Sequence, residues 1–288
     1  MTSSLLRPRG RIRTGPGAGA ADAGAVPVAG STAPTPILDW EHPRVAALLA
    51  DLAADLAAEA DVEADVEADF EGAAVGPSRQ IAGLRRAHRR ISRSVRPVYS
   101  VQDERPVSHV LRLGRGSCSQ RLAVLEAVAR ASGTATRVRG LVVDGSFWYP
   151  RFPRMRHLVP DQVLLAWPEF RLDDPAGRWL TVSELFGGLE QLSGAGGGGF
   201  TNAGPETLFE ALSRTAIDWD GATTALCPAA ATTGTAAGPA ACDLSSHVLT
   251  DLGHFASRDE LFTRHGQTLC TMARVLAEPV LGRHAAGA

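Results

Sequence analysis

The chain has 288 residues, which is enough for one large domain or two smaller ones with an ample core. Its 29 basic residues are all arginine and nearly balance 31 acidic residues. The resulting net charge of −2 favours neither nucleic acid nor an anionic membrane as a partner. The lack of lysine also excludes a Schiff-base lysine and a phosphate-loop lysine.

Targeting and metal-binding signals are weak throughout the sequence. No run of about 18 apolar residues occurs, so we expect no membrane span. No apolar segment follows the alternating arginines Arg7 to Arg13, so we expect no secretion signal and a cytoplasmic location. Four cysteines in a chain of this length do not describe a disulfide framework. The C-terminal cysteines and histidines are spaced too irregularly for structural zinc, so we expect no metal and no cofactor.

Two regions precede the centre of the chain. Residues 1–36 are rich in Gly, Ala, Pro, Ser and Thr and are predicted to be a disordered tail. Residues 37–96 are predicted to be helical and begin with an apolar stripe of Val45, Leu48, Leu49, Leu52 and Leu56. The tandem ADVEADVEADFE at 60–71 has a four-residue period and no central glycine. A solvated helix or linker is therefore favoured over a calcium-binding loop.

Residues 79–96 have the pattern of an amphipathic basic helix. Arginines stand at positions 79, 85, 86, 89, 90, 93 and 96, around the apolar Ile81, Leu84, Ala87 and Ile91. Three environments are open for them: an acidic partner, the acidic repeat just before them, or solvent. We favour the last two. No aromatic residues are interleaved for base stacking, so nucleic acid is not expected.

The central region, residues 97–192, is organised around the stretch Gly114 to Leu141. Apolar residues at three- and four-residue spacing predict a packed helix from about Ser119 to Ala131, with Ser117 as its N-cap. A strand is predicted at 137–143, before the turn signal Asp144–Gly145. Cys118 therefore lies at a helix N-terminus, where the helix dipole favours the nucleophilic thiolate.

Several motifs here resemble the transglutaminase-like superfamily, over roughly residues 95–186. They are Gly-x-Cys ending at Cys118, an apolar helix ending in Ala-x-Gly, and a strand containing Arg-Val-x-Gly. Val163 to Leu172 resembles the strand that normally reads His-Ala-Trp-x-Glu, and Arg178 to Leu185 the strand with Trp followed by aspartate. The resemblance implies an α+β fold in which a cysteine-bearing helix packs on an antiparallel sheet, flanked by N- and C-terminal helices.

The same comparison suggests how the site departs from the family. Leu165 stands where the family has its histidine, and Ser183 stands where it has its aspartate. The resemblance implies cysteine-dependent acyl transfer or amide hydrolysis on a peptide, amide or acyl substrate, with Cys118 as nucleophile. His157, on the loop before the second strand, is the candidate base, and Asp161 is the candidate orienting group. The alternative is a catalytically degenerate binding or scaffold protein, and both interpretations stay open.

Residues 193–288 are predicted to be a mostly helical extension. The glycine-rich segment 194–204 reads as a hinge, because it lacks the Gly-Lys-Ser/Thr ending of a phosphate loop. A helix is predicted at 207–217, an exposed loop at 227–242, and a helical region from His247 to about Leu281.

Overall fold

The structure is a computed structural model. It describes residues 28–64, 77–154, 156, 159–174, 176–187, 200, 202, 206–214, 244 and 247–268. Among these residues, no helix is both long enough and apolar enough to cross a membrane. The predicted loop at 227–242 and most of the predicted tail at 1–36 lie outside the described residues.

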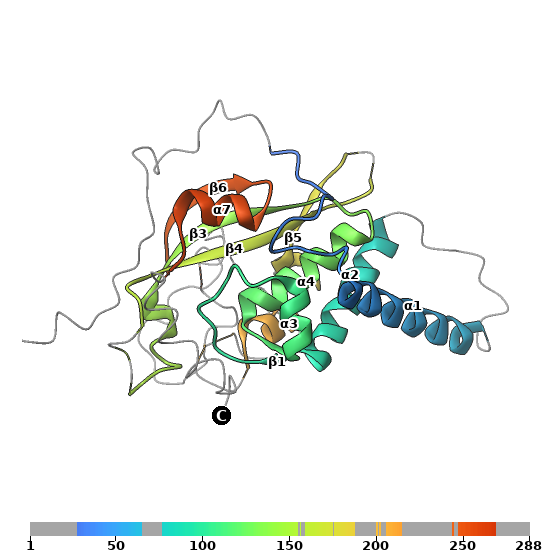
Figure 1. The fold of residues 1–288 in the computed structure, drawn as a ribbon, viewed down its shortest axis with the longest axis horizontal. Helices are drawn as coiled ribbons and strands as arrows, with labels where there is room; N and C mark the ends of the chain where they lie inside the picture. Colours follow the sequence, from blue (N-terminus) through green and yellow to red (C-terminus); the bar gives the residue numbers. More distant parts are fainter. Residues whose placement is uncertain are drawn as a thin grey trace, which may run out of the picture.

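The helical part precedes the sheet in the chain and lies on one side of its long strands (Figure 1). Its helices are α1 (Pro43–Ala64), α2 (Pro77–Ser94), α3 (Val107–Leu113) and α4 (Cys118–Ala131). A short parallel pair, β1 (Arg96–Pro97) and β2 (Arg115–Gly116), joins the end of α2 to the beginning of α4.

The central helix α4 confirms the helix predicted from the apolar spacing. Every residue from Gln120 to Arg130 is buried, because α2, α3 and the sheet pack around it. Its first turn is held by a capping box. The Ser117 hydroxyl accepts from the Gln120 backbone N–H at 3.2 Å, and the Gln120 side chain accepts from the Ser117 backbone N–H at 3.0 Å.

Four antiparallel strands form the sheet, in the order β5-β4-β3-β6. They are β3 (Thr136–Asp144), β4 (Gln162–Arg171), β5 (Trp179–Thr181) and β6 (Val248–Phe255). Three short helices lie between the strands: η1 (Gly145–Trp148) follows β3, η3 (Val182–Glu184) follows β5, and α6 (Leu208–Ala211) precedes β6. The longer α7 (Arg258–His265) follows β6. This arrangement confirms the α+β fold class.

The two faces of the sheet have different surroundings. Thr136 begins β3 and bonds Arg130 and Glu126, so its face of the sheet lies against α4. Ala166 and Phe170 of β4 share that face and are fully buried. The alternate residues, including Arg137 and Glu169, project from the other face.

The C-terminal region differs from the helical region that the sequence predicts. Residues 248–255 form β6, which pairs with β3, and only then does the chain form a helix, α7. α6 spans Leu208–Ala211, part of the helix predicted at 207–217. The last residues of the predicted N-terminal tail are placed against the rest of the protein, since Ser31 pairs with Thr136 and the Ala33 carbonyl accepts a hydrogen bond from Arg130.

Charged side chains inside the protein tie α7 and the N-terminal segment to α4. Arg258 and Glu126 form an ion pair in which both side chains are fully buried, and Arg258 also reaches the Ser119 hydroxyl at 3.3 Å. Arg130 donates to the backbone carbonyls of Ala33 and Ala256, each at less than 3 Å. α4 is therefore the helix on which segments from both ends of the chain converge.

Candidate functional site

Cys118 is the first residue of α4, as the sequence predicts, and it lies beneath α6. Its side chain is partly buried, and the backbone N–H of Phe209 lies near enough to the sulfur to lower the pKa of the thiol. Phe209 belongs to α6 and is itself fully buried. The thiol is thus covered by a segment that follows it by about 90 residues in the chain.

α6 is held over Cys118 by aromatic and ionic contacts. The Phe209 ring lies 4.2 Å from the His88 ring in a stacked arrangement, and the Arg121 guanidinium lies 4.2 Å from its centroid. Arg121 is fully buried and pairs with Glu210 at 2.5 Å. Glu210 also accepts from the Thr207 backbone N–H at 3.2 Å, so one carboxylate both caps α6 and links it to α4.

Burial raises the pKa of the Cys118 thiol to about 12. The neighbouring Arg121 and Arg258 guanidiniums lower this pKa and Glu210 raises it, but loss of hydration has the largest effect. The predicted thiolate-stabilising influence of the α4 N-terminus is therefore outweighed, and the sulfur carries its proton at neutral pH.

His88 of α2 is a buried residue beside α6, and the sequence analysis missed it. Its Nε2 lies 2.7 Å from the Phe209 carbonyl oxygen, so that nitrogen carries the proton and donates. Burial lowers the pKa of His88 to about 4, which keeps the imidazole neutral near pH 7. The sequence held one signal for it: His88 follows Leu84 at a spacing of four on the buried stripe of α2.

The contacts that the structure describes bring neither of the other predicted site residues, His157 and Asp161, to the Cys118 sulfur. His157 lies outside the described residues. Asp161 is exposed just before β4, and its carbonyl accepts from the Gly145 N–H at 2.9 Å. The charges that act most strongly on the Cys118 thiol belong to Arg121, Glu210 and Arg258.

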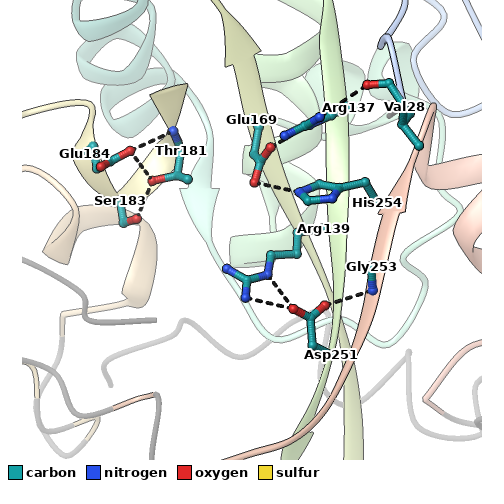
Figure 2. Close-up of polar contacts among 10 residues, drawn as sticks. All are labelled: Val28, Arg137, Arg139, Glu169, Thr181, Ser183, Glu184, Asp251, Gly253 and His254. Carbon is teal, nitrogen blue, oxygen red and sulfur yellow. Dashed lines mark hydrogen bonds and ion pairs between the residues drawn. The ribbon is translucent and has the colours of Figure 1, made fainter. Parts of the chain in front are cut away.

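Leu165 and Ser183, the residues that the sequence analysis aligned with the family's histidine and aspartate, both have defined surroundings. Leu165 is buried in β4 opposite Leu141, and alternation puts it on the same face as Glu169. Ser183 lies in η3, where its hydroxyl is 2.8 Å from the Thr181 hydroxyl (Figure 2).

A second polar cluster lies on the sheet face away from α4. Figure 2 shows its side chains. Glu169 accepts from Arg137 at 2.6 Å and contacts His254 at 3.2 Å, which joins β4, β3 and β6. Burial raises the pKa of Glu169, but hydrogen bonds from His254 and Arg137 hold it below its ordinary value. Arg139 pairs with Asp251 at 2.7 Å. These contacts fix strand positions, and the resemblance to His-Ala-Trp-x-Glu gave no indication of the His254 contact.

Within the described residues, no group of three or more His, Cys, Asp or Glu side chains could hold a metal ion. Residues 73–183 match the family model described as the transglutaminase-like superfamily, while no curated protein and no solved structure matches the chain. The matched segment contains Cys118 and ends at Ser183, before α6, β6 and α7. Residues 73–183 therefore form a domain of the transglutaminase-like superfamily.

Proposed function

We propose that this protein is a catalytically degenerate transglutaminase-like protein that serves as a binding or scaffold protein. The observation that carries the proposal is the state of Cys118. Its sulfur lies under α6, and its pKa is raised to about 12. A thiol in that state has almost no thiolate at neutral pH, and the thiolate is the form that attacks carbonyls.

The residues at the family's other catalytic positions support the same proposal. Leu165 is apolar and, like Glu169, lies on the sheet face away from α4, so it cannot accept the thiol proton. The uncharged hydroxyl of Ser183 cannot stabilise an imidazolium as a carboxylate does. The ion pair between the buried Arg121 and the half-buried Glu210, together with the neutral His88, instead holds α6 against α4.

A second candidate function is cysteine-dependent acyl transfer or amide hydrolysis. It is favoured by one observation: Cys118 is the first residue of a capped helix within the family-matched segment, where unpaired backbone N–H groups can bind an oxyanion. In this case α6 would have to move aside. His157 would then be the candidate base and Asp161 its orienting group, with a peptide, amide or acyl compound as the substrate.

The reactivity of the thiol separates the two candidates. At pH 7.5 we expect iodoacetamide to modify Cys118 in the folded protein at least about a hundredfold more slowly than in the urea-unfolded chain, because of its raised pKa. Mass spectrometry of the peptide containing Cys118 measures the rate, and the unfolded chain is the control. Modification of folded Cys118 well below pH 8.5, ahead of Cys227, Cys242 and Cys270, would instead establish the enzyme candidate.

The role of α6 as a cover can be tested with a single substitution. Glu210→Ala removes both the ion pair to Arg121 and the cap of α6, so we expect Cys118 modification to accelerate at least about tenfold, the effect of losing 1.4 kcal/mol. Glu206→Ala is the matched control, because Glu206 lies beside α6 but pairs with Arg214. Equal rates in the two variants would show that Glu210 does not hold the cover.

A further inference from the structure

Four arginines gather where α2 ends and β1 pairs with β2. They are Arg89 and Arg93 of α2, Arg96 of β1 and Arg115 of β2, together called the arginine surface. The first three are exposed and Arg115 is half-buried. α2 itself contains six arginines and no acidic residue. Within the part of the chain that the structure describes, none of the four forms a hydrogen bond or ion pair through its side chain.

The backbone forces two of these charges together. Arg96 and Arg115 are direct partners in the parallel pair of β1 and β2, held by hydrogen bonds from Arg96 N–H to Gly114 and from Val98 N–H to Gly116. Like charges on directly paired positions are destabilising. A bridging anion would remove that repulsion, and guanidinium groups bind carboxylates through two parallel hydrogen bonds.

The contacts of Arg90 show that an arginine of α2 binds carboxylates. Arg90 donates to Asp51 at 2.5 Å and to Asp55 at 3.5 Å, two carboxylates of α1 that lie one helical turn apart. The stretch Glu59–Glu71 repeats this spacing, with Asp at 61, 65 and 69 and Glu at 63, 67 and 71, and contains no basic residue. A helical form of this stretch would present carboxylates in the arrangement that Arg90 already binds.

We propose that the arginine surface binds the acidic stretch Glu59–Glu71 of a second copy of this chain. The geometry of α1 favours a second copy over the same chain. α1 continues about 13 Å past Asp55 to Ala64 at 1.5 Å per residue, and Figure 1 shows it running away from β1. This inference goes beyond the proposed function and does not depend on the state of Cys118.

Self-association of the full chain tests the proposal. We expect the weight-average mass in sedimentation equilibrium to rise with protein concentration at 50 mM salt and to rise less at 500 mM. The variant Arg89→Gln/Arg93→Gln/Arg96→Gln should weaken association at least tenfold. A control with the same loss of charge, Arg79→Gln/Arg178→Gln/Arg264→Gln, should associate as the unmodified protein does. A protein that stays monomeric at every concentration would overturn the proposal.

A peptide experiment identifies what is bound. A labelled peptide of residues 59–71 should bind the full chain in fluorescence anisotropy, and the same peptide with Asn and Gln replacing Asp and Glu should not. Binding should fall at least tenfold for the triple variant of the arginine surface. No binding of the acidic peptide, or tighter binding of a single-stranded oligonucleotide, would overturn an acidic polypeptide as the partner.

Discussion

Replacing Arg258 with alanine should lower the free energy of unfolding by about 3–5 kcal/mol. The substitution leaves the Glu126 carboxylate fully buried without the guanidinium that neutralises it. It also removes the hydrogen bond to Ser119, so α4 and α7 lose their direct polar connection. Urea unfolding followed by circular dichroism measures the change.

A matched arginine in the same helix serves as the control for this prediction. Arg264 forms an i,i+4 pair with Glu260, but its side chain is 63% exposed, so Arg264→Ala should cost less than about 1 kcal/mol. A second variant, Glu126→Gln/Arg258→Met, removes both charges together and should recover part of the loss. A cost below 1 kcal/mol for Arg258→Ala would show that the buried pair contributes little.

Acidification should destabilise the protein through His88 by up to about 3 kcal/mol. The pKa of this histidine is about 4 in the folded chain against an ordinary 6.5, because the imidazole is buried. Between these values the unfolded chain binds a proton that the folded chain does not. Stability from this group is therefore complete above pH 6.5, falls as the pH is lowered, and is lost by about pH 4.

The carboxylates also titrate below pH 5, so the prediction is best read as a difference. His88→Gln keeps a donor for the Phe209 carbonyl but cannot take up a proton. The free energy of unfolding of the unmodified protein minus that of the variant should therefore decrease from pH 7 to pH 4.5. A difference that stays constant over this range would mean that His88 is not buried as a neutral imidazole.

Local signals were sufficient for the centre of the fold. The apolar spacing around Leu122 and Leu125 predicted α4, and Ser117 is the N-cap that its residue type indicated. The strand expected at 163–172 is found as β4, and the strand expected within 178–185 is found as β5, which ends at Thr181 where η3 begins. In each case a short sequence pattern indicates the type of element.

β6 was assigned the wrong type of structure for an identifiable reason. Leu249, Leu252 and Phe255 recur at intervals of three, which imitates a helical stripe. The structure shows that the pairing with β3 shifts register between Arg139 and Leu141, and Gly253 there has φ of +79°. Such an irregularity breaks the two-residue alternation by which a strand is recognised.

The state of Cys118 could not be read from its own neighbours in sequence. Its helix position predicts a lowered pKa, but the effect that decides the outcome is burial under Phe209, about 90 residues later. His88 reaches the same place from α2. Contacts between distant segments are fixed by the complete fold, and a single sequence carries no periodic signal for them.

The dependence of α4 on Arg258 has a consequence for synthesis on the ribosome. Glu126 emerges more than 130 residues before the guanidinium that neutralises it, and β3 has a bare edge until β6 is made. A nascent chain that has just completed the family-matched segment therefore exposes an unpaired strand and cannot yet bury its central helix without cost. Completion of the fold therefore waits until β6 and Arg258 have been made, and until then the growing polypeptide would be a natural client for chaperones.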